Sequence, residues 1–109
     1  MPKYMVQASY TAAAAAAFAS NPQDRVTAVK ALIEKLGGTL HSMEFCLGEF
    51  DLVAIATLAD DVTAAAVALA ANAPGHLKAY RTTRLMSSEE FVAAQKKAHG
   101  VALTPPSKA

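Results

Sequence analysis

The segment from Phe45 to Leu58, FCLGEFDLVAIATL, constrains the fold of this 109-residue chain more than any other. Two apolar stretches with the composition of strands are joined there through Gly48 and Glu49. The connection is too short for the helix that a parallel crossover requires, so the two strands must form an antiparallel hairpin. We predict that these strands occupy residues 39–47 and 50–59.

Further elements flank the hairpin on both sides. Alternation of apolar and polar residues predicts a first strand over Lys3–Tyr10 and a fourth over His76–Leu85. The alanine-rich stretch after the first strand predicts a helix over residues 12–36. Pro22 should break it, because proline lacks the N–H of a continuous helix but suits the first position of a new one, with Asn21 as its cap.

Two more helices complete the predicted order. One opens at Asp60, and a last one opens at Ser87, where Glu90 completes a capping box. The order β-α-β-β-α-β predicts an α+β, ferredoxin-like domain with a four-stranded antiparallel sheet, two helices on one of its faces and a C-terminal helix. We assign this single domain to residues 1–100 and a flexible C-terminal tail to residues 101–109.

The sheet face without helices would expose several apolar side chains. The sheet of a second copy is the simplest cover, so we expect a homodimer. Ten basic and nine acidic side chains give a net charge of +1, which argues against nucleic-acid or membrane-surface partners. The chain shows no signal peptide or stretch of about 20 apolar residues, and its one cysteine requires no oxidising compartment, so we expect a cytoplasmic protein.

The residues Gly48-Glu49-Phe50-Asp51 resemble the Gly-(Glu)-Tyr/Phe-Asp signature of the GYD domain family. The stretches KALIEKLGGTL before it and AANAPGHLKAYRTTRLMSSEEF after it agree, so the resemblance covers roughly residues 3–94. Phe50 lacks the hydroxyl of the family's tyrosine, which removes any role that needs a phenol there. The family is similar in layout to the dimeric α/β-barrel proteins, among them small-molecule monooxygenases, haem-degrading proteins, isomerases and ligand-sensing domains. The resemblance implies paired sheets and leaves the biochemical function unassigned.

Asp51 allows two interpretations. As an acidic site with Glu49, it would act as a base or bind a hard cation, although a cation needs more oxygen ligands than one hairpin supplies. As a turn residue, its carboxylate would accept backbone N–H groups, while Gly48 takes a positive φ and Glu49 occupies the loop tip. We favour the turn and keep the acidic site as the second interpretation.

The histidines show no metal-ligand spacing, and we predict neither a metal nor another cofactor. His41 and His76 are placed so that either could reach a cleft and act as a general base, although half-exposed polar side chains are the simpler interpretation. Cys46 has no basic neighbour in the sequence to form a thiolate, so we expect an inert, buried thiol.

The fourth strand carries a polar face that includes Tyr80 and Arg84. The residues expected to share it are Lys78, Tyr80, Thr82, Arg84, Gln7, Ser9 and Glu44. Such a set would bind a small molecule between sheets, or form cross-strand pairs and a wet dimer interface, and both interpretations stay open. The candidate binding residues are His41, Glu44, Asp51, His76, Tyr80 and Arg84.

Three functions fit these observations. The first is a small-molecule-binding or stress-associated homodimer with a ligand cleft beside the sheet. The second is a metal-independent enzyme acting on a small organic molecule, of the oxygenase or isomerase type. The third is a purely structural assembly module. An open cleft would favour the first two, and a cleft filled by side chains would favour the third.

Overall fold

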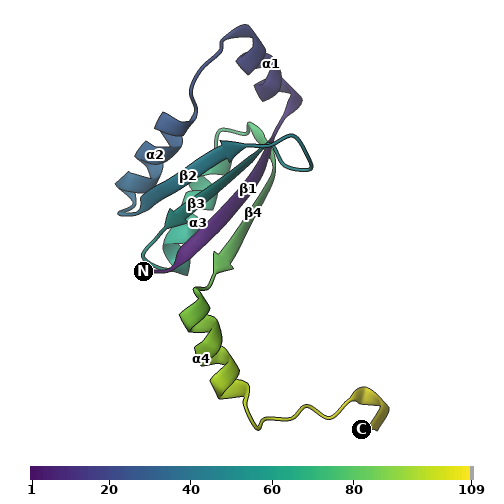
Figure 1. Cartoon of the computed structure of the whole chain (residues 1–109). Helices are drawn as coiled ribbons and strands as arrows, with labels where there is room; N and C mark the ends of the chain where they lie inside the picture. Colours follow the sequence, from purple (N-terminus) through teal and green to yellow (C-terminus); the bar gives the residue numbers. More distant parts are fainter. Residues whose placement is uncertain (109) are drawn as a thin grey trace.

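The computed structural model describes residues 1–108, and Ala109, the last residue of the predicted tail, lies outside them. Four strands form one antiparallel sheet in the order β2-β3-β1-β4 (Figure 1). They are β1 (Lys3–Tyr10), β2 (Thr39–Phe45), β3 (Leu52–Thr57) and β4 (Leu77–Leu85). The helices are α1 (Ala12–Ser20), α2 (Val26–Lys35), α3 (Asp61–Asn72) and α4 (Ser88–Ala98), followed by a 3₁₀ turn at Pro106–Lys108. The predicted α+β, ferredoxin-like order is confirmed.

The first helical region is broken, as predicted, but its second helix begins later than expected. α2 starts at Val26, whose backbone N–H donates to the Asp24 carboxylate over 2.9 Å. Asn21 instead ends α1, where its backbone N–H donates to the carbonyl of Ala17 over 2.8 Å. The predicted helix start at Pro22 with an Asn21 cap is therefore wrong, because the carboxylate closer to the apolar stretch provides the local acceptor.

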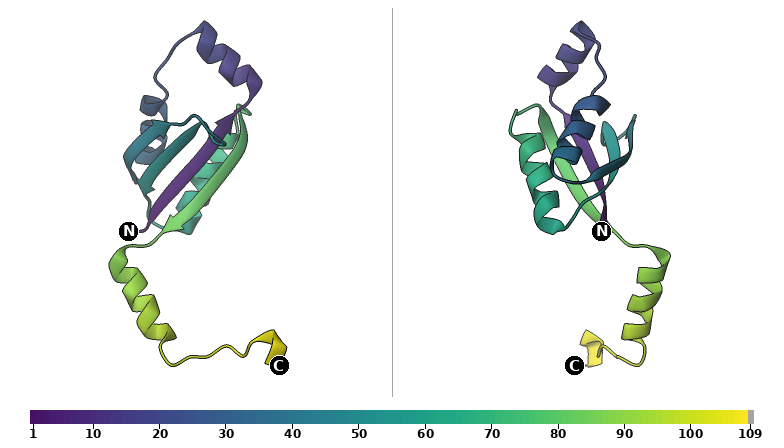
Figure 2. Two further views of the ribbon diagram at one scale, coloured as in Figure 1. Left: turned by 45° about the vertical axis from the view of Figure 1, so that its right-hand side comes forward. Right: turned by 90° about the vertical axis from the view of Figure 1, so that its left-hand side faces the viewer.

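α2 and α3 cover the same face of the sheet (Figure 2). α2 packs against β2 and α3 packs against β4, so the core lies between the sheet and these two helices. The core cluster consists of Tyr4, Ile33, Ala56, Leu58, Ala64 and Val67. Burying such side chains contributes on the order of 1.5–3 kcal/mol for each large aliphatic residue. The hydrophobic driving force is thereby concentrated on one side of the sheet.

An irregularity in β2 changes which side chains face the helices. The register against β3 shifts between Leu40 and Ser42, as at a β-bulge. Leu40 and Met43 consequently face the helices, while Ser42 and Glu44 point to the other side. Strict alternation would have placed Leu40 on the same face as Ser42 and Glu44, and the inserted residue breaks that alternation.

The other sheet face has no helix over it, and we call it the open face. Gln7 pairs with Arg81, and Ala8 pairs with Tyr80, so Gln7 and Ser9 point away from Tyr80. The predicted polar face that joined Gln7, Ser9 and Glu44 to Tyr80 is therefore wrong. The open face comprises Lys3, Met5, Gln7, Ser9, Ser42, Glu44, Val53, Ile55, Thr57, Ala79, Arg81, Thr83 and Leu85.

The β2–β3 connection turns without a left-handed residue. Among the described residues, positive φ occurs at Gly37, Gly75 and Gly100, and the prediction of a positive φ at Gly48 is wrong. The connection runs from Cys46 to Asp51, which is long enough to reverse the chain through ordinary backbone conformations. Gly48 is exposed, and an added Cβ would meet no atom within 4 Å.

α4 projects beyond the end of the sheet and buries none of its residues (Figures 1 and 2). The predicted capping box is present, because Ser87 accepts from the Glu90 backbone and Glu90 accepts from the Ser87 backbone.

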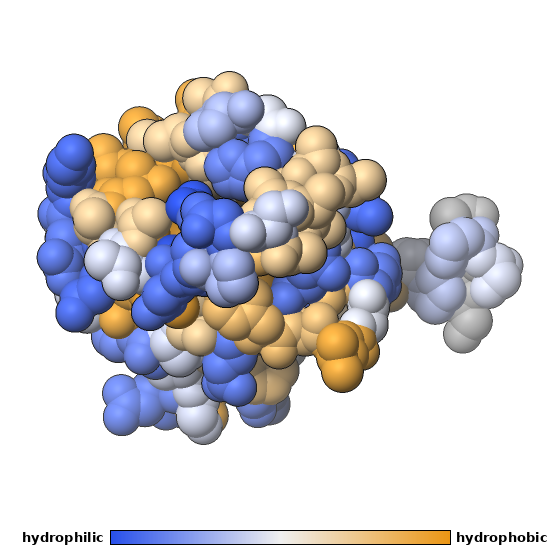
Figure 3. Space-filling view, turned by 90° about the horizontal axis from the view of Figure 1, so that it is seen from above, coloured by the Kyte–Doolittle hydropathy of each residue, from blue (hydrophilic) through white to orange (hydrophobic). Residues whose placement is uncertain are grey.

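Hydrophobic patches lie among hydrophilic side chains on the surface viewed from above (Figure 3). Within residues 1–108, every helix is too short or too polar to cross a membrane.

We expect Gly38→Ala to destabilise the protein. A Cβ at position 38 would lie 2.6 Å from Leu58 Cδ2 and 2.7 Å from the Thr57 carbonyl oxygen, so the core and β3 leave no room for it. The free energy of unfolding in urea should fall by about 1–3 kcal/mol. Gly48→Ala is the control and should change it by no more than about 0.5 kcal/mol. Equal stability of the two variants would contradict this packing constraint.

Candidate functional site

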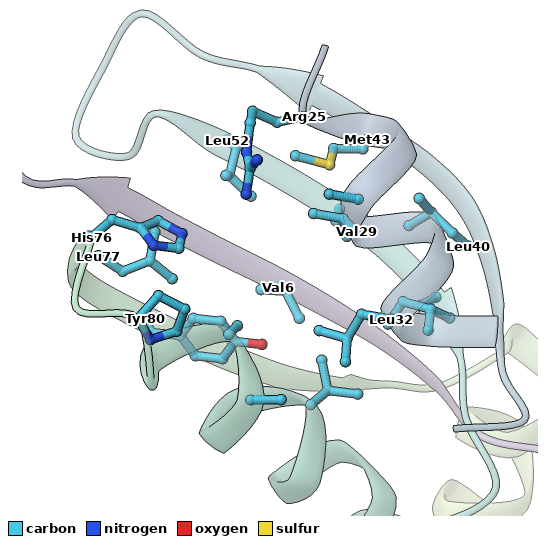
Figure 4. A pocket seen from close by; sticks show the side chains of 18 of the residues that line it. Val6, Arg25, Val29, Leu32, Leu40, Met43, Leu52, His76, Leu77 and Tyr80 are labelled. Atoms are coloured by element: carbon cyan, nitrogen blue, oxygen red, sulfur yellow. The ribbon is translucent and has the colours of Figure 1, made fainter. Parts of the chain in front are cut away.

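A pocket of about 170 Å³ lies between the helix-covered face of the sheet and helices α2 and α3 (Figure 4). Small residues create it: Ala54 and Ala56 form part of its floor on β3, and Ala70 and Ala71 line it from α3. Longer aliphatic side chains surround this space. They are Val6, Val29, Leu32, Leu40, Met43, Leu52 and Leu77. The alanine-rich composition thus leaves an apolar space that larger side chains would have filled.

One end of the pocket is polar. Tyr10 at the end of β1, Arg25 just before α2 and His76 just before β4 line it there, and we call these three residues the polar end. The Tyr10 and His76 rings stack, with centroids 6.3 Å apart. Tyr80 lies further in, and Figure 4 shows its hydroxyl directed towards Val6 and Leu32. The pocket therefore combines an apolar interior with a few convergent polar groups.

Arg25 is the cation of the polar end. Its side chain is half-buried, and its Nη1 donates to the Gln23 side-chain oxygen over 3.3 Å. Within residues 1–108 the single ion pair joins Lys30 to Glu34, so no carboxylate lies within 4.0 Å of the Arg25 guanidinium. A guanidinium carries five N–H donors in a planar fork that suits a carboxylate. Most of these donors remain available to a bound molecule.

Both phenols at the pocket are held in the protonated form. Burial raises the pKa of Tyr80, and the neighbouring Thr82 hydroxyl opposes part of that shift. The pKa of Tyr10 is also raised, mainly by burial. The Arg25 guanidinium opposes this shift, and the Asp51 carboxylate adds to it. At neutral pH, the guanidinium and the two phenols therefore offer hydrogen-bond donors, an arrangement that suits an acceptor-rich ligand group.

The candidate residues predicted from the sequence do not form one site. His76 and Tyr80 line the pocket. Asp51 lies beside it, because its Oδ2 accepts the backbone N–H of Tyr10 over 2.8 Å. His76, Tyr80 and Asp51 therefore lie around the same pocket, where Tyr10 stacks on His76 and donates its backbone N–H to Asp51.

The other three candidates lie elsewhere. His41 is exposed, and its Nε2 contacts the Oγ1 of Thr57, a residue of the open face. Glu44 also lies on the open face. Arg84 lines a separate, shallower depression beneath α3, where its guanidinium carbon lies 5.9 Å from the ring centroid of Tyr4. The sheet thus separates His41 and Glu44 from the pocket.

Asp51 connects the hairpin to the central strand β1. Its carbonyl accepts from the Cys46 N–H over 2.7 Å, and its own N–H donates to the Ala8 carbonyl over 2.9 Å. Its carboxylate accepts a backbone N–H, as the turn interpretation requires, but the donor is Tyr10 in β1 and not a residue of the loop. Asp51 therefore positions both the hairpin and the Tyr10 backbone at the polar end.

Sequence reasoning missed Arg25 and Tyr10 as residues of the site. It placed the small-molecule site between sheets or beside the sheet, and it named no candidate residue from the helical region 12–36. The available signal was the position of Arg25, directly before the apolar series that starts at Val26, together with the place of Tyr10 on the Tyr4 side of the first strand. Among residues 1–108, no group of three His, Cys, Asp or Glu side chains gathers to hold a metal ion.

The family model described as the GYD domain matches residues 4–94 of the 109-residue chain. The match includes all pocket-lining residues, the hairpin and Asp51. No curated protein matches the chain.

Asp51→Ala should destabilise the protein more than Asp51→Asn. Alanine leaves the half-buried Tyr10 N–H without its acceptor, which should lower the free energy of unfolding by about 1–2 kcal/mol. Asparagine keeps an oxygen acceptor and should retain most of the stability. Glu49→Ala, which removes an exposed side chain from the same loop, should change stability by no more than about 0.5 kcal/mol. Equal melting temperatures for the Ala and Asn variants would refute the role of the Asp51 side chain as acceptor of the Tyr10 N–H.

Proposed function

We propose that this chain, which belongs to the GYD domain family, binds a small and mostly apolar organic acid in the pocket between the sheet and helices α2 and α3. The observation that carries the proposal is the half-buried Arg25 guanidinium, which lines an otherwise aliphatic pocket and has no carboxylate partner among residues 1–108. Such a cation gains a strong hydrogen-bonded partner when an anionic ligand enters.

The size and lining of the pocket define the apolar part of the ligand. An engineered apolar cavity of roughly 150 Å³ takes up benzene, and this pocket of about 170 Å³ is of similar size. A single ring or a short hydrocarbon chain would therefore fit against Val6, Leu32 and Leu52. Removing about 100 Å² of apolar ligand surface from water would contribute about 2.5 kcal/mol.

The polar end defines the acidic part of the ligand. A carboxylate beside Arg25 would accept two parallel N–H bonds from the guanidinium, with the Tyr80 hydroxyl as a further donor inside the pocket. A hydrogen bond between charged partners contributes roughly 1.5–3 kcal/mol, or about a tenfold to hundredfold gain in affinity. Charge recognition therefore provides selectivity that the aliphatic lining lacks.

The same features favour binding over the two alternatives. Open space beneath α2 and α3 supports a ligand site in preference to a purely structural module. The Asp51 carboxylate beside the pocket already accepts a hydrogen bond from the Tyr10 N–H, so it is poorly placed to act as a general base. The remaining polar groups bind and orient an anion.

Phenylacetate and its neutral isostere phenylacetamide test the proposal. In titrations followed by two-dimensional amide NMR, phenylacetate should bind about tenfold more tightly, because only the carboxylate pairs with Arg25. The largest changes in amide chemical shift should occur for residues of α2, β1 and the start of β4. Arg25→Gln should abolish the preference for the acid while leaving the affinity for the amide nearly unchanged.

A matched pair of alanine substitutions locates the site. Ala28 and Ala31 are both exposed residues of α2, but only Ala28 lines the pocket. Ala28→Phe should block both ligands, and Ala31→Phe should leave both affinities within about twofold of wild type. Binding that survives Ala28→Phe, or an acid preference that survives Arg25→Gln, would overturn the proposed site.

A further inference from the structure

A second depression lies between the N-terminal half of α3 and the edge strand β4, which pack side by side (Figure 2). It has a volume of about 320 Å³ and opens to solvent. Two charged side chains, Asp61 and Arg84, line it together with Tyr4 and alanines of α3. It shares no lining residue with the pocket that Arg25 lines, so it is a separate space under the same helix.

The depression carries one negative and one positive side chain. Asp61 contributes a carboxylate from the first turn of α3, and Arg84 contributes a guanidinium from β4. The single ion pair within residues 1–108 joins Lys30 to Glu34, so the charged atoms of Asp61 and Arg84 lie more than 4.0 Å apart. Two opposite charges therefore line one space without forming a pair with each other.

Tyr4 determines the positions of both charges. Its hydroxyl donates to Asp61 Oδ1 over 2.5 Å, and its ring centroid lies 5.9 Å from the Arg84 guanidinium carbon. Tyr4 is only 2% exposed, so the packed core holds its ring in place. The pKa of Tyr4 is raised, mainly because its hydroxyl donates to the Asp61 carboxylate, and the phenol therefore stays a donor at neutral pH. This hydrogen bond uses Oδ1 and leaves Oδ2 of Asp61 to a ligand.

Glu90 is the other carboxylate near Arg84. Its pKa is lowered mainly by hydrogen bonds from Ser87, with a smaller contribution from the Arg84 guanidinium. Glu90 Oε1 accepts the Ser87 N–H over 3.0 Å in the capping box of α4, and no ion pair joins Glu90 to Arg84 within residues 1–108. The capping box therefore holds Glu90, and the Arg84 guanidinium keeps its N–H donors for a ligand.

Small apolar side chains form the rest of the depression. Ala64, Ala65 and Ala68 line it from α3, and their methyl groups leave room for an aliphatic group. The volume of about 320 Å³ exceeds that of an engineered apolar cavity of roughly 150 Å³ that takes up benzene. The depression thus offers two opposite charges and an apolar surface to one small molecule.

We propose that this depression binds a free aliphatic α-amino acid. The ammonium group pairs with Asp61 Oδ2, the carboxylate pairs with the Arg84 guanidinium, and the side chain lies against the alanines of α3. A simple acid would meet the negative charge of Asp61, and a simple amine would meet the positive charge of Arg84. Only a molecule that carries both charges pairs with both residues, so the site selects against singly charged analogues.

Three probes separate the two charge contacts. L-Leucine carries both charges, N-acetyl-L-leucine carries only the carboxylate, and L-leucinamide carries only the ammonium group. In amide NMR titrations of the full chain at neutral pH, leucine should bind at least about threefold more tightly than either analogue, because each analogue loses one ion pair at an exposed site. The largest changes in amide chemical shift should occur at the start of α3 and the end of β4.

Two variants identify the partner of each charge. Asp61→Asn keeps an oxygen acceptor for the Tyr4 hydroxyl but removes the negative charge, so leucine and N-acetyl-leucine should then bind with affinities within about twofold of each other. Arg84→Gln should likewise bring leucine and leucinamide to within about twofold. Circular dichroism should show both variants folded, because both side chains are exposed. Neither residue lines the other pocket, so phenylacetate binding should be unchanged in both variants.

A matched pair of substitutions on α3 locates the ligand. Ala65 and Leu69 are both exposed, but only Ala65 lines the depression. Ala65→Phe places a ring in the space of the leucine side chain and should weaken leucine binding at least about tenfold. Leu69→Phe is the control and should leave the affinity within about twofold of wild type.

Three results would each overturn the proposed site. They are the absence of saturable shifts with leucine, leucine shifts confined to the pocket that Arg25 lines, and a preference for leucine that survives both charge-removing variants. The phenylacetate titrations concern a pocket with no shared residue, so failure of either proposal leaves the other open to its own test.

Discussion

Packing of α2 and α3 against a single face of the sheet is the constraint from which the rest of the structure follows. It buries Tyr4, Ile33 and Leu58 between the layers and leaves the other sheet face without a helix. β1 lies inside the sheet between β3 and β4, so its alternating side chains divide between the core and the open face. The pocket and the open face therefore lie on opposite sides of one sheet.

Side-chain size decides what the helix-covered side becomes. Large side chains fill the end near Leu58. Position 38 has room only for glycine there, because an added Cβ would clash with Leu58. Alanines on β3 and α3 leave space nearer the polar end. Arg25, Tyr10 and His76 reach this space from segments far apart in sequence, and Asp51 secures the Tyr10 backbone. The structural role of Asp51 and the geometry of the proposed acid site are thereby connected through one hydrogen bond.

Much of the architecture could be predicted because its signals are local. The short connection around Gly48 required an antiparallel hairpin, Pro22 required a break, and the Ser87–Glu90 pair required a helix start. His76 and Tyr80 were also identified as candidate residues, and both line the pocket. Predictions failed where one residue changed the pattern. The bulge near Leu40 placed Glu44 on the sheet face opposite Tyr80, and Asp24 took the place of Asn21 at the start of α2.

By itself, the sequence determined the order of the elements, the family and the presence of a sheet with one uncovered face, because turn chemistry and periodicity act over a few residues. Only the tertiary structure decided which side chains meet. Strand pairing places Tyr4 beside Arg84 and separates Gln7 from Tyr80. Helix packing places Arg25 beside a space that alanines leave empty. These relations depend on register and packing between distant segments, which no local pattern specifies.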